Sequence, residues 1–170
     1  MPAQAADLAP EPIPNVEVLP AAYPSHWMFV HDLNFFGLHN GKIVILDVAA
    51  ATRRQKGMVG VSQFGIFARA QTRPEFYVAD SFYSRGWRGE RTDVLTIYDT
   101  TTLLPQGEIP LPGGKRLQSV TERRAFQVSR DDQLGFLFNF TPASSVSVID
   151  LVARRLIGDV DIPGCALAFP

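Results

Sequence analysis

Cysteine is almost absent from this sequence: Cys165 is the only one among 170 residues, so no disulfide can form within the chain. An excess of one charge is absent too, because 16 Lys and Arg residues balance 17 Asp and Glu residues for a net charge of −1. No apolar run reaches the roughly 18 residues of a membrane span. We therefore expect neither nucleic acid nor a membrane as a partner.

Signals of export and of common enzyme motifs are also missing. The N-terminal MPAQAADLAPEPIPNVEVLP lacks the charged start and the apolar core of a secretory signal. This leaves two interpretations open, a cytoplasmic chain or one whose leader has been removed. The sequence contains no Cys-x-x-Cys, Gly-x-Gly-x-x-Gly or Gly-x-Ser-x-Gly motif, so nothing points to a redox, dinucleotide or hydrolase site.

Proline is concentrated at the N-terminus, where residues 1–22 hold five of the 13 prolines. Such a composition predicts an extended tail without a core of its own. From residue 23 to residue 170 the sequence changes to short runs rich in β-forming residues. Helical periodicity is scarce; VTERRAFQVSRDD fits a single helical turn or a strand equally well.

Three apolar runs end in the same way: KIVILD, VLTIYD and SVSVID finish at Asp47, Asp99 and Asp150. The aspartates are 52 and 51 residues apart, and each is followed by a second run led by a glycine. Several strands recurring about every 50 residues are typical of β-propeller blades. We therefore predict an all-β fold, with three consecutive blades over residues 23–170 and an aspartate at the start of one turn in each.

The number of units predicts a partial propeller. A four-stranded sheet has two apolar faces and covers them by packing on neighbouring sheets around an axis. Closed propellers usually have four to eight blades, and three open blades would leave apolar faces exposed. We expect the chain to be part of a larger ring.

The stretch between Ser81 and Asp99 contains three arginines and two glycines within RGWRGER. We interpret it as an enlarged loop at one rim of the second unit. Its residues Arg85, Arg88 and Arg91 either bind an anionic ligand or, as nearby opposite charges favour, pair with Glu90, Asp93 or backbone carbonyls to brace the loop. Docking of another chain is a further alternative.

Three segments carry a resemblance to a known family: FYSRGWRGERTDVLTIYDTTTLLPQGEIPLPGGKR, FNFTPASSVSVIDL and DIPGCALAFP. Together they resemble the heavy chain of bacterial quinoprotein amine dehydrogenases, in order over nearly all of residues 23–170. The resemblance implies a seven-bladed propeller, of which this chain would form about three N-terminal blades.

The resemblance also implies a function. The chain would be a non-catalytic heavy subunit, inactive alone, in a periplasmic enzyme that converts primary amines to aldehydes and ammonia. It would hold no cofactor, because the tryptophan tryptophylquinone belongs to the partner light chain. Other implied partners are a second heavy chain and a blue-copper protein or cytochrome that accepts the electrons.

Two residues receive roles from the resemblance. Phe64, in GVSQFGIF, matches a phenylalanine that lines the substrate channel, and Phe67 is the alternative if the alignment shifts. Packing within the core is the other role open to Phe64. Cys165 by itself could be a free thiol, form an intermolecular disulfide or be half of a bridge whose other half is missing. In the resemblance, its PGC matches half of a disulfide whose partner would lie beyond Pro170.

The remaining candidates predict no site. His26, His31 and His39 do not have a spacing that brings their rings together, so no metal is expected. The alternative function is a propeller that binds a ligand or protein without any quinone partner; a hydrolytic propeller would need a ring of metal ligands, which the sequence lacks.

Overall fold

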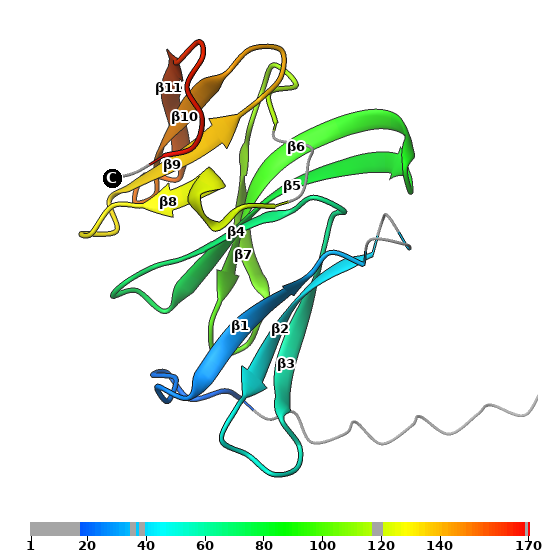
Figure 1. Cartoon of the computed structure of the whole chain (residues 1–170), viewed down its shortest axis with the longest axis vertical. Helices are drawn as coiled ribbons and strands as arrows, with labels where there is room; N and C mark the ends of the chain where they lie inside the picture. The colour runs from blue at the N-terminus through cyan, green and yellow to red at the C-terminus, as the bar shows by residue number, and fades with distance from the viewer. Residues whose placement is uncertain (1–17, 35–36, 38–39, 117–120, 169) are drawn as a thin grey trace, which may run out of the picture.

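The computed structural model describes residues 18–34, 37, 40–116, 121–168 and 170 (Figure 1). Its strands form three antiparallel sheets, one of three strands and two of four. The predicted all-β fold of successive propeller blades is confirmed. Most of the predicted tail, residues 1–22, lies outside the described residues.

The three sheets follow one another along the chain. The first sheet contains β1 (Trp27–Asp32), β2 (Gly41–Asp47) and β3 (Gln55–Val61). The second contains β4 (Ile66–Arg69), β5 (Glu75–Arg85), β6 (Arg88–Asp99) and β7 (Pro105–Pro110). The third contains β8 (Phe126–Val128), β9 (Leu134–Asn139), β10 (Ser145–Asp150) and β11 (Arg155–Asp161).

The second sheet lies between the other two and is buried on both faces (Figure 1). Phe76 and Val78 of β5 pack with Ile43 and Val59 of the first sheet. Tyr77 and Ala79, which alternate with these two residues along β5, pack instead against the third sheet. Because successive side chains of a strand point to opposite faces, one apolar run in β5 serves two interfaces.

The outer sheets keep apolar side chains on the faces turned away from the second sheet. In the first sheet, Met28 and Met58 are 47% and 53% exposed and pair across strands with Leu46 and Val44, on the face opposite the buried isoleucines of β2. In the third sheet, Val160 is 54% exposed and pairs with Val146. Both faces therefore have the character of further blade interfaces.

The repeated aspartates start turns, as predicted. Asp47 accepts hydrogen bonds from the amides of residues 49 and 50, both at 3.0 Å. Asp99 and Asp150 make the same pair of bonds with the residues two and three positions on. This repeated turn closes the hairpin between the last two strands of each blade, and it lies at one rim of all three sheets.

The stretch VTERRAFQVSRDD forms both a helical turn and a strand, the two structures that its sequence fits. A 3-10 turn spans Arg123–Ala125, capped by the side chain of Glu122, and β8 follows directly. Val120 lies outside the described residues.

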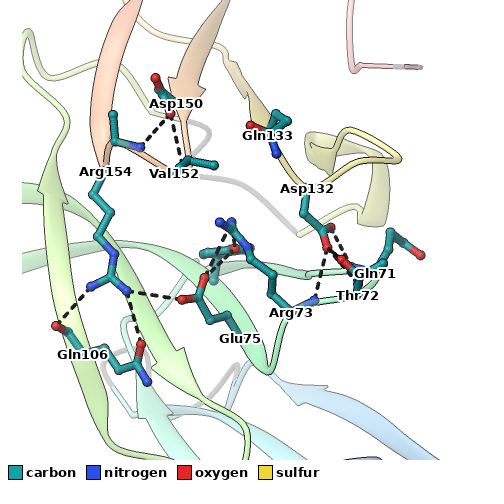
Figure 2. Close-up of polar contacts among 12 residues, drawn as sticks. Gln71, Thr72, Arg73, Glu75, Gln106, Asp132, Gln133, Asp150, Val152 and Arg154 are labelled. Carbon is teal, nitrogen blue, oxygen red and sulfur yellow. Dashed lines mark hydrogen bonds and ion pairs between the residues drawn. The ribbon is translucent and has the colours of Figure 1, made fainter.

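Polar contacts made by Asp132 and Arg154 join the second and third sheets (Figure 2). Asp132, which is 1% exposed, accepts hydrogen bonds from the amides of Gln71, Thr72 and Arg73 and from the Thr72 hydroxyl, at 2.6–3.2 Å. Arg154 reaches from the β10–β11 turn to Glu75, with Nη2 3.2 Å from Oε1. The carboxylate of Asp132 thus caps the β4–β5 turn of the neighbouring blade.

Hydrogen bonding controls the ionisation of Asp132. Burial by itself would raise the pKa of Asp132, but the amides of Gln71, Thr72 and Arg73 and the Thr72 hydroxyl outweigh burial and lower it. A lowered folded-state pKa contributes stability that is fully present above the unfolded value, about 3.9, and is lost as the pH falls through the folded value.

We predict that Asp132→Asn lowers the free energy of unfolding by about 1–3 kcal/mol, the usual worth of hydrogen bonds to a charged group. Asn tolerates the left-handed backbone of this position, φ 57°, so the change tests the carboxylate alone. Urea unfolding at pH 7 and between pH 5 and pH 2 measures the loss, and the variant should show a smaller decline in stability below pH 4.

The matched control is Asp161→Asn, at an exposed residue of β11, which should unfold like the parent. Equal stability of the Asp132 variant and the control would show that the contact does not join the sheets.

Candidate functional site

Phe64 lies in the connection between the first and second sheets. β3 ends at Val61 and β4 begins at Ile66, and the amide of Gly65 donates to the carbonyl of Ser62 at 3.1 Å to close the turn. Phe64 sits half-buried on this turn. It lies at the rim opposite the three aspartate turns, beside the β5–β6 hairpin.

The Phe64 turn is fixed to the base of that hairpin by polar contacts. The amide of Ser62 donates to Asp80 Oδ1 at 2.7 Å, and the Ser62 hydroxyl accepts from the amide of Ser81 at 3.0 Å. Asp80 is fully buried, and burial raises its pKa despite the hydrogen bonds from Ser62 and the charge of Arg116. Gly65 leaves the space that the Asp80 carboxylate occupies, because a Cβ there would lie 2.8 Å from Oδ1.

A cavity of about 80 Å³ opens next to this turn, lined by Ser62, Gln63, Phe64, Ser81, Tyr83 and Arg116. Arg116 is 1% exposed and donates from Nη2 to the carbonyl of Ala79 at 2.5 Å. Burial lowers its pKa to about 10, so the guanidinium remains positive at neutral pH. No spacing in the sequence marks Arg116 or Asp80 as site residues, because only the fold brings them together.

The prediction of an arginine-rich loop is wrong, because this stretch forms the end of a long β-hairpin. Pairing of β5 with β6 continues from Glu75 and Asp99 to Arg85 and Arg88. Gly86, with φ 72°, opens the two-residue turn, a place where hairpins favour glycine. Cross-strand hydrogen bonding therefore overrides the loop character of the sequence.

The contacts of two of the three hairpin arginines show whether they brace the hairpin or face outward. Arg91 pairs with Asp93, with Nε 2.9 Å from Oδ1, and the Ser81 hydroxyl donates to the same carboxylate. Arg88 lies over the ring of Trp87, 5.9 Å from its centroid, and Trp87 is 60% exposed. The bracing interpretation is confirmed for Arg91, while the tip presents an aromatic and basic surface.

Phe67, the alternative channel residue, lies elsewhere. It is on β4, with its ring centroid 4.9 Å from that of Phe29 and 5.8 Å from that of Phe76. It packs the first sheet onto the second and also lines a larger cavity of about 610 Å³. That cavity is lined mainly by residues of β1, β4, β8 and the segments next to β4 and β8.

His26 and His31 have different surroundings and no common partner in the described part of the chain. His26 Nε2 is 3.6 Å from Asp47 Oδ1. His31 Nδ1 is 3.3 Å from the Thr121 hydroxyl at the edge of the larger cavity, and burial lowers its pKa although Asp32 opposes the shift. His39 is outside the described residues.

Cys165 carries an exposed thiol. The described residues contain no group of three or more metal-ligating side chains. No helix in that same part of the chain is both long and apolar enough for a membrane crossing.

Comparison with known proteins identifies the family. A model described as the methylamine dehydrogenase heavy chain matches residues 26–170. The chain belongs to the methylamine dehydrogenase heavy-chain family. Among curated members, the Methylophilus methylotrophus heavy chain is 36% identical over 93 residues, which cover 55% of this chain and 23% of that protein. The Methylorubrum extorquens heavy chain is 27% identical over 172 positions, covering 99% of this chain and 40% of that one.

The chain therefore spans less than half the length of these relatives. Among solved structures, hydrazine synthase from Kuenenia stuttgartiensis matches with a TM-score of 0.53 at 16% identity, covering 86% of this chain and 36% of that one. This likeness concerns the fold alone.

We predict that Gly65→Ala destabilises the Phe64 turn by about 1–3 kcal/mol, the usual effect of overpacking. The new methyl group would meet the Asp80 carboxylate, which cannot withdraw without losing its bond to Ser62. Thermal unfolding measures the loss.

Gly60→Ala is the control, because a Cβ at Gly60 meets nothing within 4 Å. It should leave the midpoint unchanged or slightly higher. A Gly65 variant as stable as this control would mean that the Phe64 turn is not tightly packed on Asp80.

Proposed function

We propose that this chain forms part of the non-catalytic heavy subunit of a periplasmic quinoprotein amine dehydrogenase, an enzyme that oxidises primary amines to aldehydes and ammonia. The observation that carries the proposal is the family match over residues 26–170. The chemistry would come from tryptophan tryptophylquinone in a light chain, which supplies the group that accepts electrons from the amine.

In this proposal the rim around Phe64 faces the light chain. Support comes from the β5–β6 hairpin, whose tip offers an exposed tryptophan next to arginine, the residue types enriched at energetically important interface positions. Phe64 lies at the base of the hairpin and would form part of the apolar wall of the substrate channel. Its ring would select amines by fit, at about 1–3 kcal/mol per methylene-sized difference.

The remaining partners follow from the same proposal. A second heavy chain would complete the assembly, and a blue-copper protein or cytochrome would take up the electrons. The apolar outer faces of the first and third sheets would pack on further blades of the ring. Cys165 would form a disulfide with a cysteine in another segment of the longer protein, for which its exposed thiol is accessible.

A second candidate function is a propeller that binds a ligand without a quinone partner. The cavity of about 610 Å³ between β1, β4 and β8 favours it, because its size is in the range of small-molecule sites. Under this alternative the chain would purify without colour and without a small subunit.

The test is purification of the tagged chain from cells that also make its candidate light chain. We expect a small subunit and a visible quinone absorption band to follow the tag. In the assembled enzyme, Phe64→Ala should raise kcat/KM for longer amines relative to methylamine by about 10- to 100-fold, because it widens the channel.

Phe140→Ala, at a phenylalanine that is 62% exposed in the connection after β9, should leave amine preference unchanged. A colourless preparation without a light chain would contradict the heavy-subunit proposal. A coloured enzyme with unaltered preference in the Phe64 variant would contradict only the channel role.

A further inference from the structure

The guanidinium of Arg116 is buried without the partners that such a group requires. Its Nε and Nη1 atoms have no hydrogen-bond partner among the described residues. Its one hydrogen bond runs from Nη2 to the carbonyl of Ala79. A guanidinium has five N–H groups in a planar fork, and whichever Nη2 hydrogen is used, one edge of the fork keeps two parallel donors.

No carboxylate of the described residues forms an ion pair with Arg116. Asp80 and Asp93 act on it electrostatically, but neither lies within ion-pair distance of it. Asp93 is already bound by Arg91 and Ser81. Asp80 directs Oδ1 to the amide of Ser62, and its Oδ2 has no partner in the described part of the chain. Buried charges in proteins are usually paired and hydrogen-bonded, so the hydrogen bonding of Arg116 within the described residues is incomplete although two carboxylates lie near it.

The cavity beside Arg116 has the size and walls for a small anion. At about 80 Å³ it has room for several waters or for one carboxylate group, and it is far below the roughly 300 Å³ of ordinary small-molecule pockets. Ser62, Ser81 and Tyr83 also line it, and of these the Ser81 hydroxyl already donates to Asp93. Gln63, Phe64 and Tyr83 are partly exposed, so the cavity adjoins the surface.

We propose that this cavity is a carboxylate-binding site in which the free edge of the Arg116 guanidinium makes two parallel hydrogen bonds to the two oxygens of the ligand. Such bidentate pairing is the geometry in which arginine recognises carboxylates most strongly. The carboxylate is either a free small anion or the side chain of an Asp or Glu residue of another protein chain.

The charge of this site separates it from the proposed amine channel. A protonated primary amine is repelled by Arg116, so the cavity does not suit the amine itself. A carboxylate bound there would neutralise the cation next to Phe64. The site therefore goes beyond the proposed function and does not depend on it.

The test is NMR titration of the full ¹⁵N-labelled chain with sodium formate, sodium acetate or N-acetylaspartic acid amide, with sodium chloride added to keep the ionic strength constant. The signal to follow is the Nε–H of Arg116, together with the amides of Ser62 and Phe64. We expect saturable shifts of these signals. This measurement on the unaltered chain requires no variant to fold.

Arg116→Gln should weaken binding by about 10- to 100-fold, the effect of losing charge-assisted hydrogen bonds. Arg123→Gln, at an exposed arginine beside the larger cavity, is the matched control and should bind like the parent. If Arg116→Gln does not fold, Phe64→Trp tests the same site. Its larger ring should take up part of the cavity and weaken binding while Arg116 stays intact.

The ligands distinguish the two sources of the carboxylate. Saturation by formate and acetate alone supports a free anion, whereas saturation by N-acetylaspartic acid amide as well supports a protein side chain. Absence of saturable shifts with all three, or equal shifts with chloride alone, would overturn the proposal and leave a cavity filled with water.

Discussion

The burial of both faces of the middle sheet is the constraint on which the rest of the structure depends. In β5, Phe76 and Val78 face one neighbour, and Tyr77 and Ala79 face the other. A single β-sheet cannot bury both faces by itself, so each blade is stable only next to others. The capping of the β4–β5 turn by Asp132 adds a directional contact to an interface that is otherwise apolar.

This arrangement leaves the two rims of the sheets with different character. One rim carries the short turns started by Asp47, Asp99 and Asp150, which satisfy their own backbone amides. The other carries the long β5–β6 hairpin, the Phe64 turn and the buried charge of Arg116. Loops on a rigid scaffold are where binding residues usually gather, and the second rim holds the buried Arg116, whose Nε and Nη1 have no hydrogen-bond partner among the described residues.

The sequence predicted the features that depend on local periodicity. The sequence predicts the blades from two features: the alternation of apolar residues within each strand, and the same strand and turn pattern repeated about every 50 residues. The four-residue β4 gives too few alternations to be recognised, and β8 lies in a stretch whose pattern fits a strand or a helical turn equally well. Glycine and arginine are common in loops, so the sequence predicts a loop where the structure has a hairpin, whose strands are held by pairing between residues up to 24 positions apart.

The candidate site was predictable only in part. The resemblance drew attention to Phe64, and the structure places it at a cavity, but its role in a channel stays a prediction. Arg116 and Asp80 gave no signal, because a buried charged residue looks like any surface charge until the fold encloses it. Their closeness depends on how the β3–β4 turn packs against β5.

Native-state hydrogen exchange tests the central claim most directly. If the two buried faces hold the structure together, the hydrogen-bonded amides of residues 76–79 and of their partners on β6 should exchange only through global unfolding, more slowly than those of β2 and β10. Exchange of the middle sheet as fast as that of the outer sheets would contradict the account.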